Sequence, residues 1–244
     1  GMLGHAQRLL EGQPLYASPS AYFISFLYTP GYPALLALLG KVLGLSYVLG
    51  RLVSTLAFAG ALWLLYRVAA RQTGGGWWGR LWGLTAAGLA ASTFPRTGAW
   101  YDLVRNDSLY LLLVPLMLVW LVESTGRTWR TLVAAGLAAG LAFLTKQTAS
   151  LFIVFSGLVV VLRSWRRAPL YVAVVGLVAG GGVLWLNWRS GGWFWRYTFA
   201  MHQGHDFYWD RIWPVTELHL LRSSPVVAAL LGLWILTAPP RWLY

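Results

Sequence analysis

The residues best suited to chemistry in this chain lie in one short polar segment, residues 94–107, between two apolar runs. The segment holds two carboxylates, Asp102 and Asp107, and two arginines, Arg96 and Arg105. A carboxylate can accept a proton or orient a cation, and the forked guanidinium of arginine binds phosphate through two hydrogen bonds. The segment is therefore the first candidate for a site that handles an anionic substrate.

Asp107 also has a simpler interpretation. It stands directly before the apolar run 108–122, and a carboxylate at the start of a helix is stabilised by free amides and by the helix dipole. Arg105, two residues earlier, could pair with Asp107 or bind a phosphate. Both alternatives stay open at this point.

Two further cations lie near the ends of apolar runs. Lys146 occupies a polar turn of four residues, 145–148, and Arg51 lies a few residues into the run 47–66. Each could extend toward a membrane interface by snorkelling. The sharper hypothesis is that each binds a phosphate, or in the case of Arg51 the anionic head of a lipid.

The segment 188–223 is rich in aromatic residues, which stack on sugar faces and also anchor membrane interfaces. Within it, His202, His205 and Asp206 have a spacing that could hold a divalent metal, the one cofactor that the sequence suggests. The alternative is an interfacial loop in contact with solvent.

These candidates must be positioned by apolar elements. The chain is 58% hydrophobic and 11% charged, with a mean hydropathy of +0.59, whereas soluble domains average about 25% charged residues. We predict an all-α integral membrane protein with about seven transmembrane helices, although several runs fall short of the roughly 20 residues that span a bilayer. The runs are 47–66, 80–95, 108–122, 131–145, 148–162, 169–187 and 224–238.

Charge is segregated between the segments that join these runs. Loops rich in arginine alternate with segments that carry six of the seven carboxylates, so the positive-inside rule places the arginines in the cytoplasm and the acids outside. The six acids are Glu11, Asp102, Asp107, Asp206, Asp210 and Glu217. Chemistry is therefore expected on the outer face.

We treat residues 1–244 as a single membrane domain with an outer juxtamembrane segment, 1–46, and an outer loop, 188–223. The run 31–45 is short and contains Lys41, so we expect it to lie at the outer surface rather than span. If it spans, Glu11 moves to the inner side. Three pairs of glycines four residues apart are expected to allow close helix packing: Gly40/Gly44, Gly136/Gly140 and Gly176/Gly180.

A net charge of +12 does not indicate nucleic acid here, because the basic residues stand at the ends of apolar runs, as topology-setting residues do. The expected surroundings are membrane lipids. The absence of cysteine excludes disulfides and thiol chemistry.

Six short motifs, in this order and spacing, resemble the GT-C glycosyltransferases over roughly residues 8–200. The resemblance is strongest to the protein O-mannosyltransferases, the lipid A aminoarabinose transferase and the lipopolysaccharide-core galacturonosyltransferases. The motifs are Leu10-Glu-Gly-Gln-Pro-Leu-Tyr16, Tyr28-Thr-Pro-Gly-Tyr-Pro33, Gly50-Arg51-Leu52, Arg105-Asn-Asp107-Ser108, Leu144-Thr-Lys-Gln-Thr148 and Gly191-Gly-Trp-Phe194.

The resemblance implies an inverting enzyme that transfers a sugar from a polyprenyl-phosphate donor to a lipid, glycan or protein acceptor. It implies an active site on the outer face of a membrane, which we expect to be a bacterial inner membrane. The residues that the resemblance implies are Asp107 as the acid of the second outer loop and Arg105, Lys146 and Arg51 for the donor phosphate. We add Asp102 as a catalytic candidate, Arg96 as a phosphate ligand, and Tyr28, Tyr101 and Trp193 as the substrate lining.

The chain departs from the family pattern at its start. The acid that the family places in its first outer loop lies upstream of a Gly-x-x-x-Tyr segment, and Glu11 comes too late to be this residue. We therefore expect a fragment that lacks its main catalytic base, with an upstream helix and a C-terminal part missing, and that is inactive by itself.

Two other functions are weighed against transfer. A transporter or lipid flippase is expected to carry ionisable groups at mid-membrane depth, broken helices or inverted repeats, yet nearly every charge here stands at the end of a run. A non-catalytic membrane scaffold is favoured only by the missing upstream acid.

Overall fold

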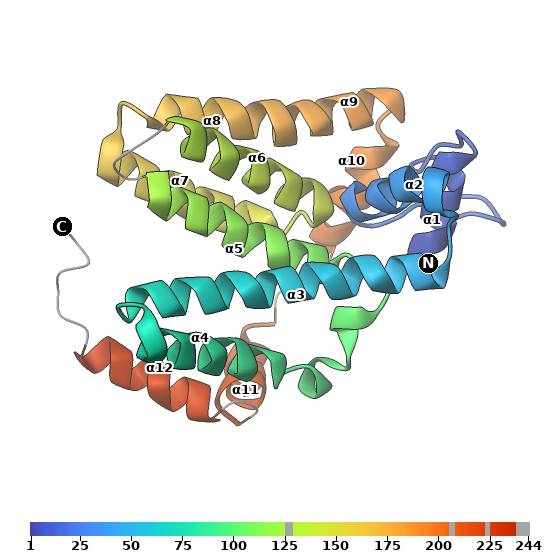
Figure 1. Ribbon diagram of the computed structural model, residues 1–244. Coiled ribbons are helices and arrows are strands. Elements are labelled where there is room, and N and C mark those ends of the chain that lie inside the picture. The colour runs from blue at the N-terminus through green and yellow to red at the C-terminus, as the bar shows by residue number, and fades with distance from the viewer. Residues whose placement is uncertain (125–128, 205–207, 223–224, 238–244) are drawn as a thin grey trace.

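The structure is a computed structural model that describes residues 1–124, 129–204, 208–222 and 225–237. Within these ranges every regular element is a helix, and the one β-contact is an isolated bridge between Ser20 and Phe23. The all-α prediction is confirmed. The long helices lie side by side and connect in up-and-down order (Figure 1).

Each predicted apolar run is helical over most or all of its length. The helices are α3 (Tyr47–Gln72), α4 (Gly76–Ala91), α5 (Asp107–Ser124), α6 (Trp129–Thr145), α7 (Ala149–Ser164), α8 (Ala168–Val175) continuing through η3 (Gly176–Gly180) into α9 (Gly181–Arg189), and α12 (Pro225–Thr237). In the described ranges, two stretches are long and apolar enough to cross a membrane, namely α3 and the continuous helix Ala168–Arg189. The count of seven spans therefore stays a prediction.

Helix α5 lies at the centre of the packing. It contacts α3 on one side and α6 on the other, and α6 in turn packs on α8 and η3. Met117 of α5, Ala139 of α6 and Tyr171 of α8 are almost fully buried in the shared core. Tyr171 keeps its hydroxyl satisfied within 2.7 Å of the Ser156 hydroxyl, so the polar end of this buried ring has a partner.

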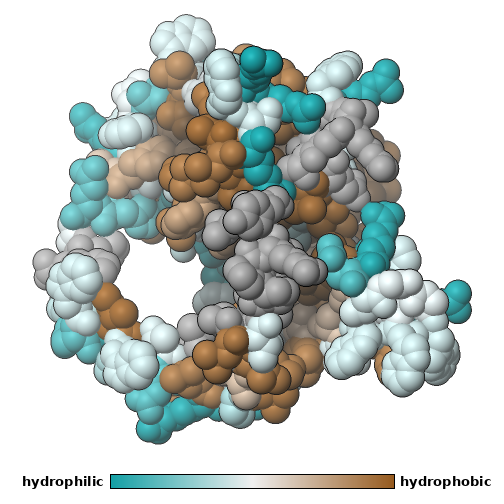
Figure 2. All heavy atoms as spheres, turned by 90° about the vertical axis from the view of Figure 1, so that its left-hand side faces the viewer, coloured by the Kyte–Doolittle hydropathy of each residue, from teal (hydrophilic) through white to brown (hydrophobic). Residues whose placement is uncertain are grey.

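Two acid-bearing segments and two arginine-bearing turns lie at opposite ends of these helices. In Figure 1 the segments 1–46 and 96–107 lie on the right, and the turns that follow α3 and α7 lie on the left. Figure 2 looks at this left-hand end, where hydrophilic side chains gather around the edge of the face and apolar ones show between them. The acid-bearing segments 1–46 and 96–107 therefore lie at the opposite end of the helices from these two turns, while the orientation in a membrane stays a prediction.

The segment 1–46 forms two short helices, α1 (Met2–Leu10) and α2 (Gly31–Leu43), that pack on each other at the right-hand end. Tyr32 of α2 is fully buried, and its hydroxyl donates to the Gly50 carbonyl oxygen at 2.9 Å. This bond joins α2 to the start of α3. Whether residues 31–45 lie on or in the membrane stays a prediction.

The remaining elements are short and follow the polar segments. They are η1 (Pro95–Thr97), η2 (Trp100–Asp102), α10 (Trp193–Thr198), η4 (Ala200–Gly204), α11 (Trp209–Thr216) and η5 (Glu217–Arg222).

One of the three glycine pairs forms a close helix contact. A Cβ atom on Gly140 would lie 2.5 Å from the Cβ of Val178, and one on Gly136 would lie 2.8 Å from a methyl of Val174. Both contacts join α6 to the helix that runs from α8 into η3. Because no Cβ fits, the backbones approach more closely than larger residues permit.

We expect Gly140→Ala to lower the free energy of unfolding by about 1–3 kcal/mol, because the added methyl forces α6 away from η3. Unfolding in detergent by added SDS measures this difference. The matched control is Gly88→Ala in α4, where a Cβ meets nothing within 4 Å. Equal stability of the two variants would contradict the close contact.

Candidate functional site

The centre of the candidate site is a carboxylate held by two cations. Asp107 accepts a hydrogen bond from Lys146 Nζ at 2.8 Å and another from Arg105 Nε at 2.9 Å. The side chain of Asp107 is 13% exposed, that of Lys146 24% and that of Arg105 38%. The cluster is therefore partly buried, and its two cations are more exposed to solvent than its carboxylate.

Two helix ends bring these groups together. Asp107 is the first residue of α5, and Lys146 follows Thr145, the last residue of α6. Because α5 and α6 are antiparallel neighbours, the start of one lies beside the end of the other (Figure 1). Each charge complements the dipole of its own helix, a carboxylate at an N-terminus and an ammonium at a C-terminus.

Asn106 fastens the same two helix ends and was not predicted. Its side-chain amide donates to the carbonyl oxygen of Thr145 at 3.1 Å, and the residue is 2% exposed. This bond satisfies one of the free carbonyls at the end of α6. An asparagine just before an apolar run is a common helix-start signal, which is the clue that the sequence offered.

Aromatic rings hold both cations from outside the ion cluster. The Arg105 guanidinium lies 4.0 Å from the centroid of the Trp100 ring, and Lys146 Nζ lies 5.7 Å from that of Tyr110. Such contacts attract a cation without consuming its N–H donors.

The pKa of Asp107 is lowered from its ordinary value of 3.8. Asp107 stands before the predicted span 108–122, in the polar segment. Burial is the largest single influence and raises the pKa, but the hydrogen bonds from Lys146 and Arg105, together with their charges, outweigh it. Asp107 is therefore ionised at neutral pH and is a weak proton acceptor.

A second ion pair lies beside this cluster. Arg51 of α3 pairs with Asp102 of η2, and their side chains are 59% and 28% exposed. The neighbouring Tyr101 stacks on Phe58 with ring centroids 4.2 Å apart, and its carbonyl oxygen accepts a 2.6 Å bond from Ser108 Oγ. Through these contacts η2 is fastened to both α3 and α5.

Other predicted site residues lie apart from the Asp107 cluster. Arg96 of η1 lines a separate cavity of about 260 Å³ with the start of α12. Trp193 of α10 lies under Arg196, whose guanidinium is 4.8 Å from its ring centroid. The Tyr28 ring faces His202 at 6.4 Å between centroids. The three were predicted as parts of one site. Tyr28 and Trp193 pack against one buried cluster that includes Phe194, whereas Arg96 lies at the separate cavity.

The predicted metal site receives no support from the described residues. His205 and Asp206 lie outside them, and no group of three His, Cys, Asp or Glu within them could hold a metal ion. His202 has a ring nitrogen 3.2 Å from the carbonyl oxygen of Leu27. A metal at this position stays a prediction.

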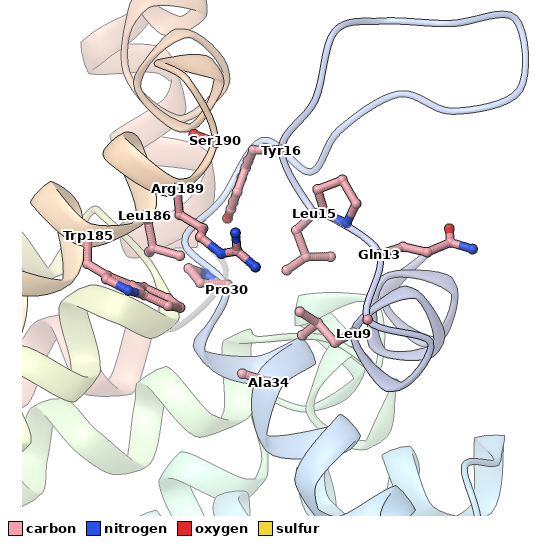
Figure 3. Close-up of a pocket in the computed structure, with 12 residues that line it drawn as sticks. Leu9, Gln13, Leu15, Tyr16, Pro30, Ala34, Trp185, Leu186, Arg189 and Ser190 are labelled. Carbon is pink, nitrogen blue, oxygen red and sulfur yellow. The ribbon is translucent and has the colours of Figure 1, made fainter.

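A cavity of about 610 Å³ lies at the same end of the molecule, between the segment 9–16, the start of α2 and the end of α9. Figure 3 shows Arg189 pointing into it, with Trp185 and Leu186 on one side and Leu9 and Leu15 on the other. Its lining is mainly apolar. The sequence did not reveal this cavity, because its walls come from segments more than 150 residues apart.

The comparison with known families first gives a class: the chain matches a family of membrane-embedded, GT-C-type glycosyltransferases. The family that matches is described as dolichyl-phosphate-mannose-protein mannosyltransferase, the match covers residues 28–187, and the chain belongs to this family. Its members use polyprenyl-phosphate sugar donors. No curated protein and no solved structure matches the chain, so the branch within the family stays a prediction.

We expect Asp107→Asn to lower the unfolding temperature at neutral pH, because Lys146 and Arg105 lose a buried charged partner worth about 1–3 kcal/mol. The folded-state pKa lies below 3.8, so this contribution is complete well above pH 3.8 and is lost as the pH falls through the lowered pKa. The difference in unfolding temperature between Asp107→Asn and the unchanged protein should therefore be constant from pH 8 to pH 5. It should become smaller as the pH falls below 4.

Thermal unfolding in detergent between pH 3 and pH 8 measures this difference. The control is Asp210→Asn in α11, an exposed carboxylate away from the cluster, which should show no difference at any pH. A gap for Asp107→Asn that widens in acid would overturn the assignment.

Proposed function

We propose that this protein transfers a sugar from a polyprenyl-phosphate carrier to an acceptor on the non-cytoplasmic face of a membrane, and that the Asp107 cluster binds the donor phosphate. The observation that carries the proposal is the convergence of Arg105 and Lys146 on Asp107 at the helix ends where the acids gather. Membership of a family that uses such donors supports it.

The cluster leaves donors free for a phosphate. Arg105 gives Asp107 its Nε–H, and an arginine has four further N–H groups in a planar fork. Lys146 gives one of its three N–H groups. Asp107 therefore orients both cations while most of their hydrogen-bonding capacity stays open to an anion from the exposed side.

In the proposed reaction the acceptor hydroxyl or amine attacks the anomeric carbon of the sugar. A new bond forms there as the bond from that carbon to the phosphate oxygen breaks, and its electron pair leaves with polyprenyl phosphate. The acceptor gives its proton to a general base. Cations that neutralise the departing phosphate lower the barrier, and they act more strongly in a partly sheltered site than in water.

Asp107 has the role of a positioning residue in this proposal, since two cations hold its carboxylate and lower its pKa. Asp102 is the better candidate for proton transfer among the two predicted acids. Its ion-pair partner among the described residues, Arg51, is largely exposed, so this pair exchanges readily with solvent or substrate.

The apolar cavity near Arg189 suits the lipid part of a substrate. It is mainly apolar and the Arg189 side chain points into it, a combination that suits the phosphate and the hydrocarbon chain of a lipid. We propose that this cavity receives a lipid-linked substrate at the same end of the molecule as the Asp107 cluster.

We expect Lys146→Ala to lower kcat/KM for the donor at least tenfold, because the departing phosphate loses one of its two charge partners. Lys146→Arg should recover part of the loss, and Asp107→Asn should raise the donor KM. The assay follows radiolabelled sugar from polyprenyl-phosphate donors into membrane acceptors. It uses the protein in membranes of the cells that naturally produce it.

The control is Lys41→Gln, which removes a cation from the last turn of α2 and should leave transfer unchanged. Unchanged kinetics in both Lys146→Ala and Asp107→Asn would remove the cluster from the donor site. A protein that moves a polyprenyl-linked lipid across vesicles but transfers no sugar would be a transporter or flippase instead.

A further inference from the structure

A third cavity lies at the opposite end of the helices from the Asp107 cluster. It is a groove of about 380 Å³ between α3 and α5, and its apolar lining comes from both helices. The apolar lining residues are Leu64, Leu65, Val68, Pro115, Leu118, Val119 and Val122. It is far from the proposed chemistry, so sugar transfer gives it no role.

Arginines stand at this groove from two helices. Arg67 and Arg71 come from α3 and Arg163 from α7, and the other described residues of the lining are apolar except Gln72. Arg67 is only partly exposed, and in the described part of the chain neither it nor Arg163 has a hydrogen-bond or ion-pair partner. An arginine carries five N–H donors, so the groove presents unused donors beside an apolar surface.

The groove has the dimensions of a lipid chain within one leaflet. Its α3 wall runs from Leu64 to Gln72, about 12 Å at 1.5 Å per residue. One leaflet of a bilayer is roughly 15 Å of hydrocarbon. The end of the molecule that Figure 2 shows has apolar surface exposed between hydrophilic side chains, as such a site requires.

We propose that this groove binds one anionic phospholipid of the surrounding bilayer, with an acyl chain along α3 and α5 and the phosphate between Arg67 and Arg163. Charge complementarity selects the occupant, because a zwitterionic lipid brings a cation to the same arginines whereas an anionic lipid does not. Basic pockets between membrane helices recognise anionic headgroups in this way. The proposal rests on the membrane embedding of the family and not on sugar transfer.

The test titrates delipidated protein in detergent with phosphatidylglycerol or phosphatidylcholine and counts bound lipids by native mass spectrometry. We expect one phosphatidylglycerol to bind more tightly than phosphatidylcholine. The double variant Arg67→Gln with Arg163→Gln should lower the affinity for phosphatidylglycerol roughly tenfold to thirtyfold. Arg80→Gln with Arg130→Gln, in the first turns of α4 and α6 and outside the groove, is the charge-matched control and should bind normally.

A second pair of variants tests the apolar part without changing charge. Val119→Trp fills the groove and should remove phosphatidylglycerol binding, while Val154→Trp on the exposed face of α7 should not. If the double arginine variant fails to fold, Arg163→Gln alone carries the test, since this side chain is exposed. Equal binding of both lipids, or tight phosphatidylglycerol binding that survives both the arginine and the tryptophan changes, would overturn the proposal.

Discussion

The contact between Asp107 and Lys146 joins the start of α5 to the end of α6, and the geometry of the candidate site depends on it. Asp107 stabilises the free amides at one helix end, Lys146 stabilises the free carbonyls at the other, and each satisfies the other's charge. Asn106 adds a neutral bond between the same two ends. Structural and functional interpretations of Asp107 therefore do not compete, because the helix-end role is what places the cations.

The same arrangement explains why cations can gather without destabilising the fold. Arg105 and Lys146 share one carboxylate, and Arg51 has Asp102. Partly buried charges are tolerated when they are paired, and each of these cations keeps donors that its acid does not use. A site prepared in this way can receive a phosphate with little rearrangement.

The molecule carries positive charge at both ends but uses it differently. At the end with the acids, arginine and lysine are held by carboxylates and aromatic rings beside the helix starts. At the other end, Arg67 and Arg163 stand at an apolar groove and have no partner among the described residues. The first arrangement suits a substrate that binds transiently, and the second suits a lipid that stays bound.

The amino-acid sequence by itself determined the helices, because long apolar runs form helices through local backbone hydrogen bonds, and charged residues mark the ends of these runs. All seven runs became helices, and the candidate residues Arg105, Asp107 and Lys146 were found from types and positions alone. The family resemblance was also readable from the order of short motifs, and the family match over residues 28–187 confirms it at that level.

Only the tertiary structure decided which of these residues meet. Gly140 packs against Val178 while Gly176 and Gly180, with the same spacing, have nothing within 4 Å, because close approach depends on the neighbouring helix. Likewise Arg105 and Lys146 share Asp107 whereas Arg96 lines another cavity. Residue spacing fixes position along one helix, but the distance between helices is set by side chains that are remote in sequence.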